Sequence, residues 1–228
     1  MFFYDPTWII ILPALILTIW AQSNINSAYS KYSRVMNRRG MTGYDAARKI
    51  LDMNGLQNVK IEHIAGRLSD HYDPRTNVVR LSDGVYSSTS VAAIGVAAHE
   101  VGHAVQHAVG YAPIRIRNAI VPVVSICSQL AVPLFILGLI FSSSLFVLTD
   151  IGIILFAAAV VFHLITLPVE INASRRALST LESTYMLDGE EVSGAKKVLT
   201  AAAMTYIASA ATALLQLLRL VAIRGRRD

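Results

Sequence analysis

The chain has 228 residues, of which 54% are hydrophobic and 15% charged, and its mean hydropathy is +0.50. It is more apolar than an ordinary soluble domain of this size, so we expect it to lie in a membrane. The net charge of +5 comes from Lys and Arg at the edges of apolar stretches, and no recognition motif accompanies them, which argues against nucleic acid as a partner. The single cysteine, Cys127, excludes an intrachain disulfide and a thiolate metal cluster.

Four uncharged stretches predict the membrane-spanning helices: residues 6–30, 118–149, 151–169 and 198–218. Each has about 19 residues or more, which suffices to cross a hydrocarbon core of about 30 Å. No Lys or Arg precedes the first stretch, so it lacks the basic start of a cleavable signal peptide and is expected to be a retained anchor. The fourth is rich in Ala and small polar residues, which suits a membrane helix but also a buried soluble helix. The predicted fold is mainly α, a multi-pass membrane protein with about four transmembrane helices.

Lys and Arg residues beside these stretches predict the orientation in the membrane. They lie at both ends of residues 31–117 and occur again within 170–197, so both segments are expected in the cytoplasm. The connection between the second and third stretches lacks them and is expected outside. The chain then divides into an anchor (1–30), a cytoplasmic domain (31–117), a transmembrane hairpin (118–169), a cytoplasmic segment (170–197) and a C-terminal helix with a basic tail (198–228). Four arginines at the end conflict with four complete crossings, which would leave them outside: Arg219, Arg224, Arg226 and Arg227.

The cytoplasmic domain is predicted to hold two helices around a short β-ribbon. The first helix is expected to begin at Thr42 and to end at Asn54 and Gly55. Alternating apolar and polar residues predict a strand over 58–64, and two strand-like pieces flank a turn at 73–76. The second helix is capped within 87–90 and ends at Gly110. In the later segment, a polar loop is expected to expose Glu182, Glu190 and Glu191.

The second helix carries an HExxH motif within VAAHEVGHAVQHAVG, residues 96–110. His99 and His103 lie one turn apart on the same face, which is the spacing of two zinc ligands. Glu100 lies beside them, where it can take a proton from water activated by the metal. The neighbouring residues are small or uncharged, as a buried helix with a metal site requires. The alternative is that these are ordinary helix histidines near the membrane surface.

The third ligand is expected to come from outside this helix. His107 shares the face, but its Cα lies about 12 Å from that of His99 along a straight helix, so one zinc cannot bind both. The sequence also lacks the glycine that turns the chain before a third histidine in metzincins. Glu170 directly follows the third apolar stretch, where the hairpin returns the chain to the side of the histidine helix. The prediction is a His99, His103, Glu170 site for one catalytic Zn²⁺, with a fourth position open to water.

The motif helix AAHEVGHAVQH, the preceding DHYDPRTNVVRLSDGVYSSTSVAAIGV and the later LPVEINASRRAL resemble the membrane zinc metallopeptidases of the YugP type. The resemblance extends over essentially the whole chain, including its opening FFYDPT. That family is similar to the gluzincin peptidases and, more distantly, to the heat-shock membrane protease and CAAX-protease group. The resemblance implies zinc ligands at His99, His103 and Glu170, general base and acid work by Glu100, and a small α+β zincin-like cytoplasmic domain.

One position departs from the gluzincin pattern, which places an aspartate four residues after the ligand glutamate to orient a ligand histidine. Here that position is Ser174, and a hydroxyl is a weaker partner than a carboxylate. Either Asn172, His71 or Asp70 takes over this role, or the zinc is held less firmly.

The expected chemistry is hydrolysis of amides by water that zinc activates, with Glu100 moving the proton. A further donor should stabilise the oxyanion, and the candidates for this or for substrate contact are Arg175, Arg176, His107, His71 and Tyr206. The strand-like NVVRLS could offer an edge to which an extended substrate adds, or it could lie inside the sheet.

Three function classes compete. The leading one is a membrane-anchored zinc endopeptidase of the inner (plasma) membrane, acting at the cytoplasmic surface on membrane or misfolded proteins. The second is a zinc hydrolase with a narrow substrate, and the third is a membrane scaffold or adaptor that binds zinc without turnover. The expected partners are a polypeptide substrate and the lipid bilayer, while protein partners or a homo-oligomer stay open.

Overall fold

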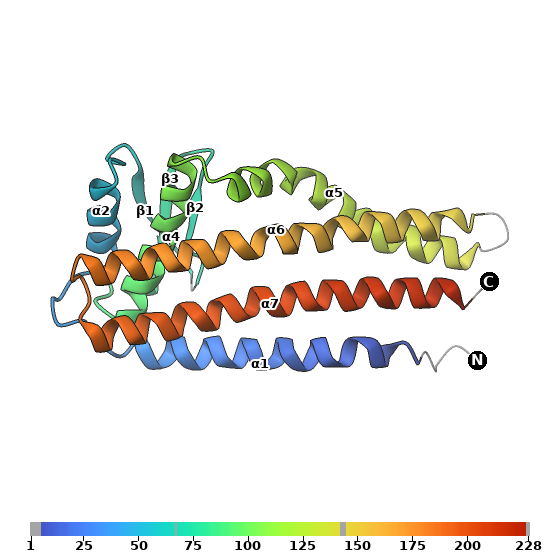
Figure 1. Cartoon of the computed structure of the whole chain (residues 1–228), viewed down its shortest axis with the longest axis horizontal. Helices are drawn as coiled ribbons and strands as arrows, with labels where there is room; N and C mark the ends of the chain where they lie inside the picture. Colours follow the sequence, from blue (N-terminus) through green and yellow to red (C-terminus); the bar gives the residue numbers. More distant parts are fainter. Residues whose placement is uncertain (1–5, 67, 142–144, 227–228) are drawn as a thin grey trace. The chain divides into compact units, whose positions relative to one another are not determined.

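A computed structural model describes residues 6–66, 68–141 and 145–226 of the chain (Figure 1). It has helices α1 (Trp8–Tyr32), α2 (Gly43–Met53), α3 (Asp83–Tyr86), α4 (Val91–Ala108), α5 (Ala112–Ile140), α6 (Val147–Ser183) and α7 (Gly189–Gly225). The strands are β1 (Lys60–Ile64), β2 (His71–Asp73) and β3 (Val78–Ser82). The fold is mainly helical with one small sheet, as the sequence predicts.

Helices α1, α5, α6 and α7 are each long and apolar enough to cross a membrane. This confirms the number of candidate spans, but the helix boundaries differ from those of the apolar stretches. The apolar stretch 118–149 does not form a single helix, because α5 ends at Ile140 and α6 begins at Val147. A helix of the full stretch would be about 48 Å long, far more than a hydrocarbon core of about 30 Å requires. Part of the connection that was expected outside, residues 142–144, lies outside the described residues.

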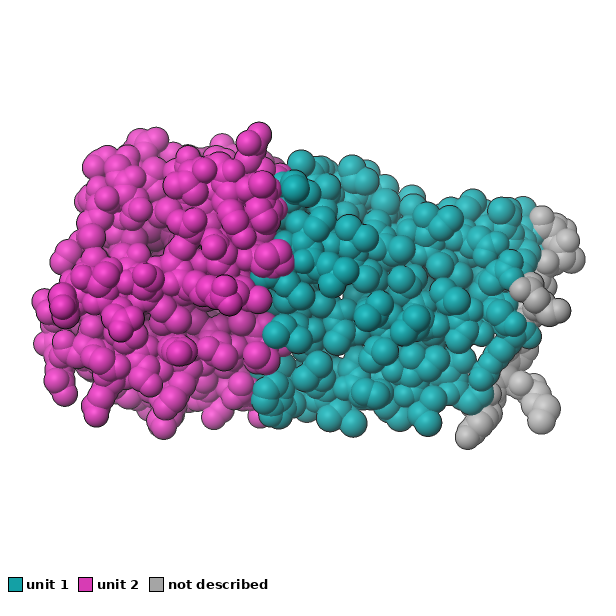
Figure 2. Space-filling model, viewed as in Figure 1, with its two compact units in different colours: residues 1–21, 116–167, 205–228 teal, residues 22–115, 168–204 magenta. Residues whose placement is uncertain are grey.

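The chain forms two compact units, drawn in teal and magenta in Figure 2. Unit 1 comprises residues 1–21, 116–167 and 205–228, and unit 2 comprises residues 22–115 and 168–204. The five segments expected from the sequence stay a prediction. The two units reflect contacts within the chain, and such contacts do not show where a membrane begins and ends.

In unit 1, close helix packing depends on small residues. A Cβ atom at Gly152 of α6 would lie 2.7 Å from the carbonyl oxygen of Ala131 of α5, so glycine permits the two backbones to approach. Thr18 of α1 and Thr212 of α7 share a hydrogen bond of 3.2 Å between their hydroxyls. Small and hydroxyl side chains therefore line the contacts between these helices, as is common in membrane proteins.

Two of the arginines near the end of α7, Arg219 and Arg224, have partners within unit 1. Arg224 forms an ion pair with Asp150, with a distance of 2.9 Å from Nε to Oδ1. Arg219 donates from Nε to the hydroxyl of Thr7 at 3.1 Å, and its guanidinium lies 4.0 Å from the ring centre of Trp8. These contacts give the basic end of α7 a structural role, so its charge is weaker evidence on orientation than the sequence alone suggests.

Unit 2 contains the small sheet, with strand order β1-β3-β2. Strand β3 pairs in parallel with β1 and antiparallel with β2. It is therefore the central strand, with both edges occupied, and the idea that NVVRLS offers an edge to a substrate is wrong. Strands β1 and β2 form the edges.

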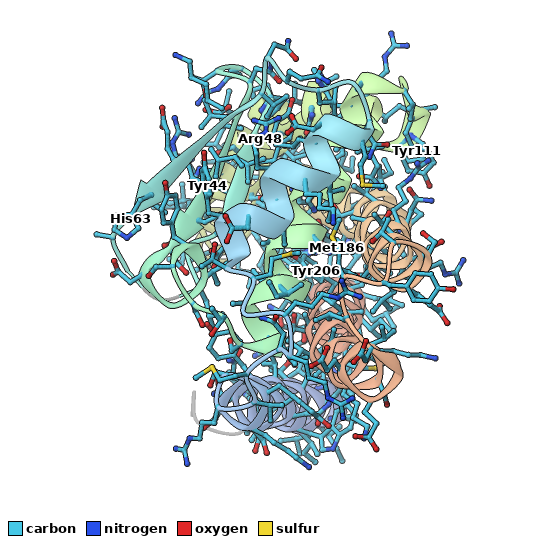
Figure 3. All side chains as sticks on the ribbon, turned by 90° about the vertical axis from the view of Figure 1, so that its left-hand side faces the viewer. Tyr44, Arg48, His63, Tyr111, Met186 and Tyr206 are labelled. Atoms are coloured by element: carbon cyan, nitrogen blue, oxygen red, sulfur yellow. The ribbon has the colours of Figure 1, made fainter. Side chains whose placement is uncertain are left out.

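The helix boundaries of unit 2 follow local signals in the sequence. Thr42 accepts a hydrogen bond from the backbone of Asp45, and the Asp45 carboxylate accepts one from the backbone of Thr42, forming the expected capping box of α2. Arg48 of α2, which is labelled in Figure 3, donates to the carbonyl oxygens of Leu56 at 3.0 Å and Val59 at 2.8 Å. These bonds hold the end of α2 against the start of β1.

Residues 170–197 are mostly helical, which corrects the expectation of a solvated loop. Helix α6 continues to Ser183 and α7 already begins at Gly189, so Glu182 and Glu190 lie on helices, although both side chains are exposed as expected. Glu191 is buried, and its carboxylate accepts hydrogen bonds from the backbone N–H groups of Arg38 at 2.8 Å and Asp188 at 2.9 Å. Its charge serves the start of α7, where a carboxylate is favoured.

Candidate metal centre

Helix α4 is the buried centre of unit 2. Its cap is Ser90, whose hydroxyl accepts a hydrogen bond of 3.2 Å from the backbone N–H of Ala93, and Gly110 follows its end with a φ of +66°. Eight of its 18 residues are Ala or Gly, so its neighbours can lie close on several sides. The HExxH motif therefore sits on a helix that is shielded from water along most of its length.

Two glycines bring α4 close to other helices. A Cβ atom at Gly102 would lie 2.9 Å from the carbonyl oxygen of Ala173 on α6, and one at Gly95 would lie 3.3 Å from the Cβ of Ala195 on α7. Gly102 stands directly before His103, and Ala173 stands three residues after Glu170. The glycine inside the motif thus permits the approach that brings the imidazoles to the carboxylate.

His99, His103 and Glu170 form a compact group of potential ligands. Their nearest ligand atoms all lie within 4.8 Å of one another. Glu170 Oε2 lies 3.3 Å from His99 Nε2 and 3.6 Å from His103 Nε2, and the two rings stand nearly perpendicular with centres 4.8 Å apart.

These distances fit a metal better than direct hydrogen bonds. A bond from an imidazolium N–H to a carboxylate spans about 2.7–2.9 Å, which is shorter than both distances. Ligands at about 2.0–2.1 Å from a tetrahedral zinc lie about 3.3–3.4 Å from each other. Two nitrogens and one oxygen are also a donor set that zinc accepts in catalytic sites, so the residues fit a zinc ion.

The second nitrogen of each ring has a partner that fixes the ring in place. His99 Nδ1 lies 3.1 Å from the hydroxyl of Ser174, the residue that replaces the gluzincin aspartate. His103 Nδ1 lies 3.0 Å from Oε1 of Gln106, one turn further along α4. Each ring therefore turns its Nε2 toward Glu170.

Gln106 is a site residue that the motif alone does not reveal. It is fully buried, and its Nε2 donates at 2.9 Å both to the carbonyl oxygen of Val169 and to Oδ1 of Asn172. Arg176 donates from Nε to the same Asn172 oxygen at 2.8 Å. The available signal was its position three residues after His103 and seven after His99, which places a polar amide on the helix face that carries both histidines.

Charge and burial act in opposite directions at the site. Without a metal, burial disfavours the charged ring of His103, whereas the negative charges of Glu170 and Glu100 and the hydrogen bond with Gln106 favour it, and the net effect raises its pKa. Glu100 is only 9% exposed, and its carboxylate accepts no hydrogen bond from any other residue that the structure describes. Its oxygens are thus available to a water molecule beside the histidines.

His107, His71 and Asp70 have partners of their own. His107 is exposed and its Nδ1 lies 3.2 Å from the hydroxyl of Tyr72. Nδ1 of His71 lies 2.8 Å from the carbonyl oxygen of Ser69. The carboxylate of Asp70 accepts from the backbone N–H of Ser82 at 2.7 Å and from its hydroxyl at 2.9 Å. Of the proposed partners for the ligand histidines, the structure brings Ser174 to His99 directly and Asn172 to His103 through Gln106.

The remaining candidates differ in position. Arg175 is exposed and, with Arg176, lines a cavity of about 380 Å³ between α2, α4 and α6. The described lining of this cavity contains none of the three potential ligands, so it is separate from the candidate metal centre. Tyr206 belongs to unit 1, and its contribution to the site stays a prediction.

Comparisons with known proteins show the family of the chain. The chain is 49% identical over 212 residues to the "Putative membrane protease YugP" of Bacillus subtilis (strain 168), a match that covers 93% of each chain. No solved structure matches the chain. The family model described as "Putative neutral zinc metallopeptidase" matches residues 7–225, which confirms the resemblance stated from the sequence. The chain therefore belongs to this family of zinc metallopeptidases.

Proposed function

We propose that the protein is a membrane-embedded zinc endopeptidase in which His99, His103 and Glu170 hold one catalytic zinc. The observation that carries the proposal is the spacing of Glu170 Oε2 at 3.3 Å and 3.6 Å from the two Nε2 atoms, which matches the edges of a zinc coordination tetrahedron. Three protein ligands leave a fourth position for water or substrate, as a catalytic site requires.

Bound zinc supplies Lewis acidity, which makes water acidic enough to serve as a nucleophile at neutral pH. Glu100 accepts the proton of that water as its oxygen attacks the carbonyl carbon of the peptide bond. When the bond between carbon and nitrogen breaks, Glu100 passes the proton to the leaving amine. The low exposure of Glu100 suits this work, because few bulk waters compete for its oxygens.

Membrane or misfolded polypeptides at the cytoplasmic surface are the proposed substrates. Glu170 directly follows the uncharged stretch 151–169, so the site lies close to where α6 leaves the apolar part of its length. The basic residues at both ends of residues 31–117 and within 170–197 favour a cytoplasmic position for this end.

The deciding experiment compares the purified wild type with Glu100→Gln, using unfolded proteins and membrane peptides as substrates and measuring bound zinc in both. We expect the wild type to cut and the variant to retain zinc while losing activity by about 10²–10⁴-fold. Glu170→Ala should lose zinc and activity together. If both proteins bind zinc and neither cuts any substrate, a narrow-substrate hydrolase or a zinc-binding scaffold replaces the proposal. If the folded wild type binds no zinc, the metal site itself is wrong.

A further inference from the structure

We infer that Arg176, acting through Asn172 and Gln106, fixes the proton of His103 on Nδ1 and so presents Nε2 as a lone pair toward Glu170. These three are positioning residues, since none of them belongs to the proposed ligand set. The inference rests on the proposed zinc site, and it adds which residues prepare one ligand for the metal.

The first step sets the amide of Asn172. A guanidinium can only donate hydrogen bonds, so the Asn172 atom 2.8 Å from Arg176 Nε must be the oxygen. Arg176 and Asn172 are four residues apart on α6, which places them on one face of the helix. The charge at one end of the chain of hydrogen bonds therefore determines the orientation of the next group.

The second step sets the amide of Gln106. Its amide nitrogen lies 2.9 Å from the Asn172 oxygen and 2.9 Å from the carbonyl oxygen of Val169. Both partners are acceptors, and an amide NH₂ group has two hydrogens to donate. A reversed amide would place an oxygen against two oxygens in a fully buried position, which costs free energy. Gln106 therefore turns its oxygen toward His103.

The third step determines which ring nitrogen of His103 carries the hydrogen. The Gln106 oxygen lies 3.0 Å from His103 Nδ1 and can only accept, so the hydrogen must be on Nδ1. In the neutral ring, Nε2 then carries the lone pair, which is the form that binds a metal. His103 is 7% exposed and Gln106 0%, so bulk water cannot readily replace this partner.

His99 provides a contrast within the same site. Its Nδ1 faces the hydroxyl of Ser174 at 3.1 Å, and a hydroxyl can either donate or accept. Ser174 orients the ring but does not by itself decide which nitrogen carries the hydrogen. The chain from Arg176 thus gives His103 a fixed tautomer, whereas that of His99 depends on the zinc and on the hydroxyl.

The test measures zinc affinity by competition with a chelator, together with the visible spectrum of the cobalt-substituted protein. We expect Gln106→Met, which keeps the size but removes both hydrogen-bonding groups, to weaken zinc binding by about 10–100-fold and to alter the cobalt spectrum. Gln106→Glu keeps an acceptor for the Nδ1 hydrogen and should recover part of the affinity. Arg176→Met, which leaves the buried amide in place, should weaken binding by about 3–10-fold, while Arg175→Met is the matched control and should bind zinc as the wild type does.

A direct readout needs no variant that risks the fold. In zinc-free wild type labelled with ¹⁵N at histidine, at a pH where the ring of His103 is neutral, we expect this ring to carry its hydrogen on Nδ1, assigned by its loss in His103→Gln. A hydrogen on Nε2, or wild-type affinity in both Gln106→Met and Arg176→Met, would overturn the inference. Failure of the wild type to bind zinc would instead count against the proposed function, so the two failures are distinct.

Discussion

The hydroxyl of Ser174 lies 3.1 Å from Nδ1 of His99, and Ser174 stands one helical turn after Glu170 on α6. The same helix therefore supplies a potential ligand and the group that orients another. Asn172, also on α6, reaches His103 through Gln106. Both histidines of α4 are thus held by the short part of α6 that follows the apolar stretch, which ties the site to the packing of two helices.

Replacing Ser174 tests how much its hydroxyl contributes. We expect Ser174→Ala to weaken zinc binding by about 10-fold, because the ring of His99 loses its partner, and Ser174→Asp to bind zinc at least as tightly as the wild type, because a carboxylate is the stronger partner for an imidazole N–H. Chelator competition measures both, and Ser179→Ala, an exposed position on the same helix, is the control. Equal affinity in Ser174→Ala and the wild type would mean that Ser174 does not orient His99.

Gly102→Ala tests whether the close approach of α4 and α6 builds the site. The added Cβ would lie 2.9 Å from the carbonyl oxygen of Ala173, so the helices must move apart. We expect a loss of about 1–3 kcal/mol in stability and a clear loss of zinc affinity. Gly189→Ala, where an added Cβ meets no atom within 4 Å, should change neither the thermal midpoint nor zinc binding measurably. A Gly102→Ala protein with wild-type affinity would separate the metal site from this helix contact.

Features that depend on neighbours in the sequence could be predicted. The Thr42 and Asp45 capping box and the Ser90 cap each involve residues three apart, so local spacing was sufficient. His99 and His103 share a face by the same reasoning, and Glu170 followed from where the apolar stretch ends. The four apolar helices were visible because length and hydropathy alone define them.

Features that depend on partners far away in the sequence could not be predicted. The central place of β3 arises from pairing with both β1 and β2, and alternation within one strand does not reveal its neighbours. Gln106 gains its role from Asn172, 66 residues later, so it reads locally as a polar residue on an apolar helix. The sequence does not reveal where α6 ends and α7 begins, because charged residues mark only where the apolar stretches stop. Both helices extend into the charged segment between them, and Glu191 of α7 is buried there.

Asp73 should make the sheet turn sensitive to acid. Hydrogen bonds from the backbone of Arg75 and the side chains of Thr76 and Arg80 lower its pKa to about 2, below about 3.9 in the unfolded chain. Because the pKa is lower in the folded protein, the ionised carboxylate of Asp73 adds to the free energy of unfolding. This stabilisation is complete above about pH 4 and is lost as the pH falls through about 2. We expect Asp73→Asn to lose about 1 kcal/mol at neutral pH, with the difference from wild type shrinking between pH 4 and 2.

Thermal unfolding at a series of pH values measures this difference. Arg75→Gln is the matched control, because that side chain is 91% exposed and its backbone N–H, which bonds Asp73, is retained. A difference between Asp73→Asn and wild type that stays constant from pH 7 to pH 2 would contradict the assignment.

Cysteine labelling tests the proposed orientation, since Cys127 is the single native cysteine and can be replaced by Ser. Arg75→Cys reports on the exposed turn between β2 and β3, and Phe141→Cys reports on the end of α5, where the side chain is 51% exposed. With a membrane-impermeant maleimide, we expect Phe141→Cys to react in intact cells and Arg75→Cys to react only after permeabilisation. Arg226→Cys then decides whether α7 crosses completely, because a full crossing places it on the side of Phe141. Labelling of Arg75→Cys in intact cells would put the candidate metal centre outside the cytoplasm and leave its chemistry unchanged, but it would require extracytoplasmic substrates.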